Sequence, residues 1–101
     1  MSNMTAVLLL RRRVVVADDA FVEIVIWRLP KALPPSRHMF KYRLAYVVDG
    51  DCVVRYDNEQ GKGDHRHYEA RETRFRFSDP ETLIADFEAD IRRWNDENGR
   101  S

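Results

Sequence analysis

The sequence predicts an α+β protein in which an antiparallel sheet of about five strands packs against one C-terminal helix. Three observations point to this fold class. Runs of β-branched residues are separated by turn residues, apolar and polar side chains alternate within the later runs, and a capped amphipathic segment follows them. The chain has 101 residues and a hydrophobic content of 44%, which suits one packed core. We therefore expect residues 1–101 to form a single domain.

The first expected hairpin lies near the N-terminus. Residues 6–17 (AVLLLRRRVVVA) and 20–29 (AFVEIVIWRL) are rich in β-branched and aliphatic residues, and the turn-forming pair Asp18-Asp19 separates them. Within the first strand the arginines at 11–13 should alternate, with Arg12 facing opposite to its two neighbours. Residues 29–38 contain three prolines, which cannot continue a central strand, so a loop is expected there.

The clearest hairpin joins residues 40–48 (FKYRLAYVV) to 52–58 (CVVRYDN). A three-residue loop at 49–51 makes one face almost wholly apolar, because it pairs Val48 with Cys52, Tyr46 with Val54, Leu44 with Tyr56 and Tyr42 with Asn58. A two-residue loop would oppose Leu44 to Arg55, so the longer loop is expected. On the other face it sets Arg43 across from Asp57. Cys52 is expected to be a small buried residue.

The C-terminal third should contain the last strands and the helix. Residues 65–77 (HRHYEARETRFRF) predict one last strand or a pair of strands. The helix should begin with a capping box of Ser78 and Glu81, with Pro80 in its first turn, and end at Asn98-Gly99. Its apolar stripe consists of Leu83, Ile84, Phe87, Ile91 and Trp94.

Charge and cysteine content limit the function classes. The 17 basic and 17 acidic residues balance, so no global field draws the chain to nucleic acid or to a membrane surface. Residues 79–98 hold seven of the acids, which predicts a basic sheet beside an acidic helix. A single cysteine cannot form an internal disulfide or a Cys-rich zinc site. No stretch reads as a signal peptide or a membrane span, so we expect a soluble cytoplasmic protein.

Residues 53–69 (VVRYDNEQGKGDHRHYE) concentrate the reactive side chains. His65 and His67 lie two apart, so in a strand both imidazoles point to one face. With Lys62, Asp57 and Arg55 nearby, they are the residue types that in-line phosphodiester cleavage uses. Such cleavage needs a base for the 2′-hydroxyl, an acid for the leaving oxygen and cations for the developing phosphorane charge. A site of this kind needs no metal and no other cofactor.

Three other interpretations stay open for the same stretch. A loop rich in Gly, Asp, Lys and Glu can simply be solvated, because polar residues on an exposed strand face need no functional explanation. His65 and His67 with Asp64 or Asp57 could instead supply two imidazoles and a carboxylate to a metal, as in a metal-assisted nuclease. Finally, the polar hairpin face could dock a protein partner without catalysis.

Three segments together resemble the TumE-type toxins of bacterial toxin-antitoxin pairs. They are LLLRRRVVVADDAFVEIVIWRLP, SRHMFKYRLAYVVDGDCVVRYDNEQGKGDHRH and FRFSDPETLIADFEADIRRW, and they cover essentially the whole chain. The most specific part is RYDNEQGKGDHRH, in which an Arg-x-Asp-Asn strand end is soon followed by a histidine-rich segment.

The resemblance implies a cytoplasmic toxin that is neutralised by a helix-turn-helix antitoxin encoded beside it, and it leaves room for a homodimer within that complex. An RNA substrate is implied by analogy with RelE-like toxins, which also use a small basic sheet. The family-like positions are Arg55, Asp57, Asn58, His65 and His67.

Chemistry adds roles for these and neighbouring residues. The expected catalytic residues are His65 and His67 as base and acid, Lys62 as a phosphate-stabilising cation and Asp57 as the orienting carboxylate. The expected substrate-binding residues are Arg55, Asn58, Arg43 and Tyr56. Asn58 could alternatively fix the turn.

Overall fold

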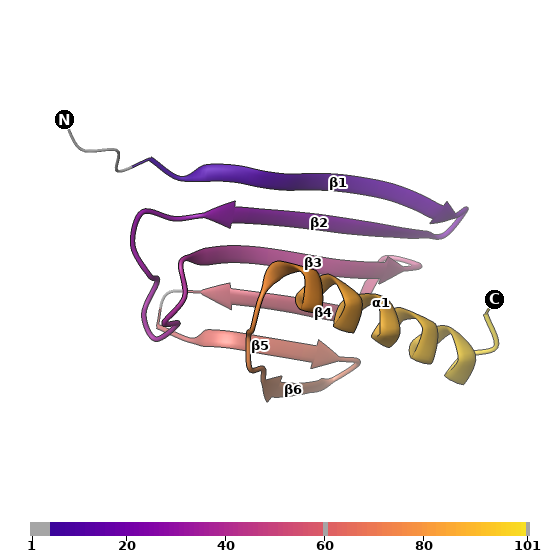
Figure 1. Cartoon of the computed structure of the whole chain (residues 1–101). Coiled ribbons are helices and arrows are strands. Elements are labelled where there is room, and N and C mark those ends of the chain that lie inside the picture. The colour runs from indigo at the N-terminus through magenta and orange to yellow at the C-terminus, as the bar shows by residue number, and fades with distance from the viewer. Residues whose placement is uncertain (1–4, 60, 101) are drawn as a thin grey trace.

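The computed structural model describes residues 5–59 and 61–100. They form a six-stranded antiparallel sheet, whose strands neighbour one another in chain order, and one helix against one face of it (Figure 1). The elements are β1 (Val7–Ala17), β2 (Ala20–Arg28), β3 (Phe40–Val48), β4 (Asp51–Glu59), β5 (Gly63–Tyr68), β6 (Arg71–Arg74) and α1 (Pro80–Glu97). The predicted fold class is confirmed. The sixth strand arises because residues 65–77 contain a pair of strands rather than one.

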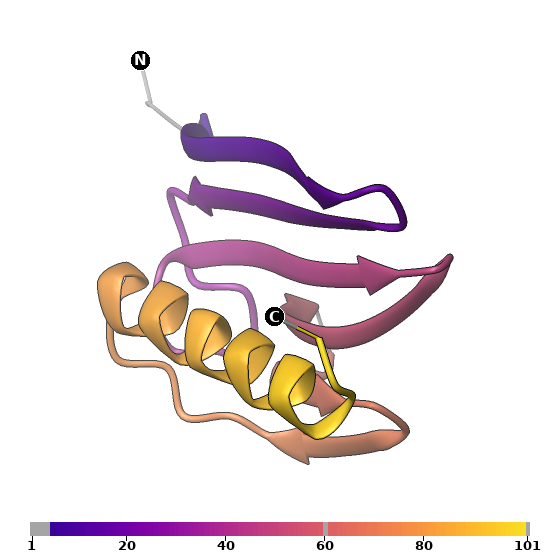
Figure 2. The same ribbon diagram turned by 90° about the vertical axis from the view of Figure 1, so that its right-hand side faces the viewer.

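The core lies between α1 and the face of the sheet that it covers, which we call the inner face. The helix packs over β3 and β4, and the β1–β2 hairpin extends beyond it (Figure 2). From the helix, Leu83 and Phe87 are fully buried, Trp94 is nearly so, and Ile84 and Ile91 pack partly buried at the edge of the core. The predicted apolar stripe is therefore confirmed. No helix among the described residues has the length and apolar character needed to cross a bilayer.

The helix begins at Pro80, but its N-cap is Asp79 and not the predicted Ser78. Asp79 Oδ1 accepts a hydrogen bond from the backbone N–H of Thr82 at 2.7 Å, which satisfies one of the free amides of the first turn. The hydrogen bonds from the backbone and the hydroxyl of Thr82 lower the pKa of the Asp79 carboxyl. Because Pro80 occupies the first helical position, the residue directly before it becomes the cap.

The turn between β3 and β4 is shorter than predicted. It consists of Asp49 and Gly50, whose φ angles of 51° and 82° are both positive, as a tight primed hairpin turn requires. Val48 therefore opposes Asp51, and the predicted pairing of Val48 with Cys52 is wrong. Cys52 is also exposed, contrary to the prediction that it is buried.

A β-bulge then restores the register that the apolar pattern predicted. The pairing shifts between Tyr46 and Val47, so that Val53 is the extra residue of β4. Beyond the bulge Tyr46 opposes Val54, Leu44 opposes Tyr56 and Arg43 opposes Asp57, as predicted. The bulge thus allows a two-residue turn without setting Leu44 against Arg55, which was the reason for expecting a longer one.

Three tyrosine hydroxyls tie the sheet to the helix. Tyr46 donates to Asn95 Oδ1 at 2.7 Å, Tyr56 to Asp90 Oδ2 at 2.6 Å, and Tyr68 to Glu97 Oε1 at 2.5 Å. Burial, together with the hydrogen bond to Asp90, raises the pKa of Tyr56, and the same two causes, with Glu97 as acceptor, raise the pKa of Tyr68 to about 12. The hydroxyls of Tyr56 and Tyr68 therefore stay protonated and act as donors at physiological pH.

Replacing Tyr56 by Phe should destabilise the protein. The change leaves the Asp90 carboxylate, which also accepts from Arg66 Nε at 2.6 Å, with one donor fewer on the inner face. We expect the free energy of unfolding to fall by about 1–3 kcal/mol, measured by urea denaturation. Tyr68→Phe, whose hydrogen bond is exposed to solvent, is the matched control and should cost less. An unchanged free energy of unfolding in Tyr56→Phe would contradict this structural role of the hydroxyl.

Candidate functional site

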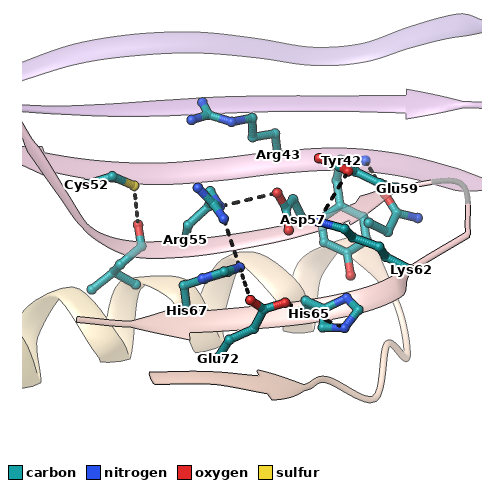
Figure 3. A network of polar contacts seen from close by, with 12 residues as sticks. Tyr42, Arg43, Cys52, Arg55, Asp57, Glu59, Lys62, His65, His67 and Glu72 are labelled. Carbon is teal, nitrogen blue, oxygen red and sulfur yellow. Dashed lines mark hydrogen bonds and ion pairs between the residues drawn. The ribbon is translucent and has the colours of Figure 1, made fainter. Parts of the chain in front are cut away.

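Seven polar side chains gather on the outer face of the sheet, the face turned away from α1 (Figure 3). β4 and β5 pair so that Arg55 opposes His67 and Asp57 opposes His65. Alternation along each strand then brings all four side chains to the same face. We call the whole group the histidine cluster, and its members are Arg55, Asp57, Glu59, Lys62, His65, His67 and Glu72.

The imidazole of His67 is held by Arg55. Arg55 Nη2 lies 2.8 Å from His67 Nε2. A guanidinium can only donate, so in this hydrogen bond His67 Nε2 is the acceptor. Arg55 Nε also lies 3.2 Å from Asp57 Oδ2, as an ion pair that is not aligned as a hydrogen bond. Asp57 therefore acts on His67 through Arg55.

The imidazole of His65 is engaged through its other nitrogen. Its Nδ1 lies 3.0 Å from the carbonyl oxygen of Gly63. A carbonyl can only accept, so this nitrogen carries a proton and Nε2 remains available for proton exchange. His65 Nε2 faces Glu72 Oε1 at 3.8 Å, while the other carboxylate oxygen of Glu72 lies 3.7 Å from His67 Nε2. Glu72 thus stands between two imidazoles that are bound in opposite ways.

Glu72 and Glu59 are members of the cluster that the sequence analysis missed. Glu72 opposes His67 across the β5–β6 hairpin. Its position follows once a tight turn at Glu69-Ala70 is assumed, because the residues on either side of such a turn pair in order. Glu59 forms an ion pair with Lys62 at 4.0 Å.

The cluster is shallow and closely filled. The space enclosed between its side chains is about 20 Å³, room for a single water molecule. The side chains of His65 and His67 are 17% and 22% exposed, whereas that of Lys62 is 67% exposed. A ligand would therefore lie across the top of the cluster, where the Lys62 side chain is largely exposed.

Arg43 shares the outer face but is turned toward the neighbouring strand. Although it opposes Asp57 in the sheet, its Nη1 donates to Glu23 Oε1 at 3.3 Å. Asp57 forms its ion pair with Arg55 instead. Arg43 thus borders the histidine cluster without contacting the imidazoles.

Tyr56 and Asn58 lie on the inner face, so the structure does not bring them to the histidine cluster. Both are 2% exposed. Asn58 Oδ1 accepts from the backbone N–H of Tyr42 at 2.9 Å, and Asn58 Nδ2 donates to the carbonyl of Phe40 at 2.7 Å. These bonds prolong the β3–β4 pairing where the backbone ladder ends.

Asp64 also points to the inner face, into a separate network. Its carboxylate accepts from the Tyr42 hydroxyl at 2.6 Å and from Ser36 Oγ at 3.0 Å, and it lies 2.7 Å from His38 Nε2. The other nitrogen of His38 accepts from the backbone N–H of Phe40 at 3.1 Å. Burial and the bond to Asp64 raise the pKa of Tyr42. His38 has both nitrogens engaged and remains on this face.

The metal-site interpretation needed a carboxylate beside the two imidazoles. Asp64 lies on the opposite face, whereas Asp57 shares the outer face with the two imidazoles and opposes His65 in the sheet. Within residues 5–59 and 61–100, no group of three or more His, Cys, Asp or Glu side chains has the arrangement of a metal site. The four residues expected to be catalytic, His65, His67, Lys62 and Asp57, do meet on the outer face.

Comparison with known proteins gives one match. The family model described as toxin TumE matches residues 5–95. No curated protein and no solved structure was found to match the chain. The matched region includes all of the sheet and most of α1, and with them the whole histidine cluster.

Proposed function

Because the chain belongs to the TumE toxin family and is thereby the toxin component of a toxin–antitoxin system, we propose that it is a metal-independent endoribonuclease of a type II pair. The observation that carries this proposal is the pairing of two differently bound imidazoles with a guanidinium in one cluster. His67 Nε2 is bound as an acceptor, and His65 Nδ1 as a donor. Combined base and acid catalysis requires one imidazole whose free lone pair accepts a proton and a second that gives one up, and the two rings are held here through different nitrogens.

In the proposed reaction His67 is the general base. A phosphate that binds Arg55 draws the guanidinium away from His67 Nε2, whose lone pair then accepts the proton of the 2′-hydroxyl. His65, protonated on both nitrogens and facing Glu72, gives its Nε2 proton to the departing 5′-oxygen. A bond forms between the 2′-oxygen and phosphorus, and the bond from phosphorus to the 5′-oxygen breaks. The products are a 2′,3′-cyclic phosphate and a 5′-hydroxyl.

The cations of the cluster would stabilise the charge that develops on the phosphorane. Arg55 is held beside His67, and the Lys62 side chain is largely exposed at the other end of the cluster, near Glu59. The shallow shape of the cluster supports binding of an RNA backbone across the outer face, along which Arg43 also lies. We assign Asp57 a positioning role through Arg55, and Tyr56 and Asn58 structural roles.

The proposal extends to the partner and the compartment. A helix-turn-helix antitoxin encoded beside the toxin would neutralise it in the cytoplasm. The basis for this part is the family membership, since a toxin of this kind implies an antitoxin.

Induction of the toxin in cells that lack the antitoxin tests this function. We expect growth to stop while RNA is cleaved, and we expect the purified protein to cleave RNA equally well with and without a chelator of divalent metals. Growth arrest with intact RNA would contradict ribonuclease action. Cleavage that stops with the chelator would identify a metal-assisted nuclease instead.

One observation favours a second candidate function, a non-catalytic docking face. The charges of the cluster are already paired, Lys62 with Glu59 and Arg55 with Asp57, and little space remains between them. A polar surface of this kind could bind a protein partner through charge complementarity. Under that function, exchange of the histidines would leave toxicity largely unchanged.

Replacing Glu72 by Gln should slow RNA cleavage moderately. Its carboxylate lies 3.8 Å from His65 and is 46% exposed, so solvent screens its effect on the imidazolium. We expect a loss of about two- to fivefold in rate, equivalent to the 0.5–1 kcal/mol of a partly exposed ion pair. The matched control is Glu69→Gln, in the turn before β6, which should not change the rate. A greater loss in the control than in Glu72→Gln would contradict the positioning role of Glu72.

A further inference from the structure

The strand β1 forms a free edge of the sheet that is unusually apolar. All but one of the exposed large hydrophobic side chains of the described residues belong to β1, namely Val7, Leu8, Leu9, Val14, Val15 and Val16. The opposite edge, β6, is only four residues long and reads RETR. A short charged strand is a protected edge, whereas a long apolar strand with unpaired backbone groups is a template for another strand.

A groove on the inner face runs beside this edge. Its volume is about 390 Å³, and it lies between the β1–β2 hairpin and the helix. Val14, Val22 and Ile24 line it from the sheet and Ile91 lines it from α1, while Arg12 stands at its β1 side. The groove exists because α1 packs over β3 and β4 and leaves the hairpin uncovered (Figure 2). Apolar side chains of a strand added beside β1 would pack into this groove.

The charges of β1 distinguish between two partners that could pair with this edge, a second copy of the chain and a different protein. Arg11, Arg12 and Arg13 are exposed in the middle of the strand, between apolar residues on both sides. Arg12 faces the groove, whereas Arg13 lies on the outer face, 4.1 Å from the centre of the Phe21 ring. Because β1 runs from Val7 to Ala17, a two-fold axis that pairs its whole length with a second copy passes through Arg12. Such pairing would set arginines against arginines, which is destabilising.

We propose that β1 and the adjoining groove are the docking site of an extended antitoxin segment that adds a seventh strand to the sheet. The segment carries acidic residues at its centre, opposite Arg11–Arg13, and apolar residues on both sides, of which those on the inner face enter the groove. Backbone pairing supplies general affinity in this mode, and the side-chain pattern supplies specificity. The inference rests on the toxin–antitoxin part of the proposed function. It does not depend on RNA cleavage.

Charge reversal on β1 tests the docking site. The variant Arg11→Glu/Arg12→Glu/Arg13→Glu and the single variant Arg12→Glu are compared with a control of equal charge change, Lys31→Glu/Arg71→Glu/Arg76→Glu, whose side chains are exposed elsewhere. The affinity of the purified toxin for the purified antitoxin is measured, with circular dichroism as a check on folding. We expect roughly a 100-fold or greater loss of affinity for the triple β1 variant. The single variant should lose less, and the control under about threefold.

Four outcomes of this experiment decide whether the antitoxin docks on β1. Loss of antitoxin binding in the folded β1 variants, with binding kept in the control, supports the site even if the wild-type toxin proves unable to cleave RNA. Unchanged antitoxin binding overturns it, even if RNA is cleaved as proposed. A wild-type toxin that dimerises alone, with the dimer lost on β1 substitution, overturns it in favour of a second copy. Loss of RNA binding alone overturns it in favour of an RNA contact.

Discussion

Replacing His65 and His67 together by Ala is expected to abolish RNA cleavage and growth arrest. The change removes the proposed base and the proposed acid, each of which contributes about 10²- to 10⁴-fold in reactions of this kind. The two act in one step, so their contributions are not expected to add fully. We expect the cleavage rate of the purified variant to fall at least roughly 10³-fold. The assay is the rate of RNA cleavage, together with growth after induction.

The fold should survive this double substitution. Both imidazoles lie on the outer face, away from the core that Leu83 and Phe87 fill from the helix. The free energy of unfolding should change by less than about 1 kcal/mol. Lys31→Ala, an exposed position in the loop between β2 and β3, is the control for loss of a polar side chain and should keep cleavage. Full toxicity in the folded double variant would contradict the catalytic role and favour the docking face.

Replacing Phe87 by Ala is expected to have the largest effect on stability. Phe87 is fully buried at the centre of α1, and its ring meets that of Tyr56 edge-on with centroids 6.1 Å apart. Truncation leaves a cavity between helix and sheet, at a cost of about 3–5 kcal/mol. A domain of this size has a free energy of unfolding of about 5–15 kcal/mol, so much of the population could unfold at growth temperature.

Urea denaturation of the purified proteins measures this effect. The neighbouring Glu88→Ala is the matched control, because its side chain is exposed and its loss should change the free energy of unfolding by less than about 0.5 kcal/mol. Phe87→Leu keeps most of the buried volume and should fall between the two. A loss below about 1 kcal/mol for Phe87→Ala would mean that α1 does not close the core as described.

Most of the fold prediction was based on the periodicity of apolar residues along the sequence. The apolar stripe of the helix and the alternation in the central hairpin gave the helix, the sheet and the register beyond the bulge correctly. The errors arose where competing local chemistry decides between neighbouring positions. Ser78 and Asp79 can both cap a helix, and Pro80 at the first helical position selects Asp79. A bulge at Val53 leaves no mark in the hydrophobic pattern, because Cys52, Val53 and Val54 are all apolar and show no alternation that an extra residue would interrupt.

The sequence predicted those features of the site that follow from the alternation of side chains along a strand, and no others. Because His65 and His67 are two residues apart in a strand, both were predicted to lie on one face. The predicted register of the central hairpin also set Arg43 across from Asp57. The same register had already placed Tyr56 and Asn58 on the apolar face, so their distance from the cluster follows from their position in the strand. The position of Glu72 opposite His67 could be predicted only by assuming the tight turn between β5 and β6. The engagement of Arg43 by Glu23 needs the pairing of β2 with β3, which local sequence does not contain.

The most direct test of the account is cleavage by the purified toxin of a mixed-sequence RNA and of the same sequence with 2′-deoxyribose throughout, both in excess chelator. Attack by the 2′-hydroxyl predicts that the RNA alone is cut, with 2′,3′-cyclic phosphate and 5′-hydroxyl ends. Cleavage of both strands, or an RNA left intact by a folded toxin that still arrests growth, would contradict catalysis by His65 and His67 on the outer face of the sheet.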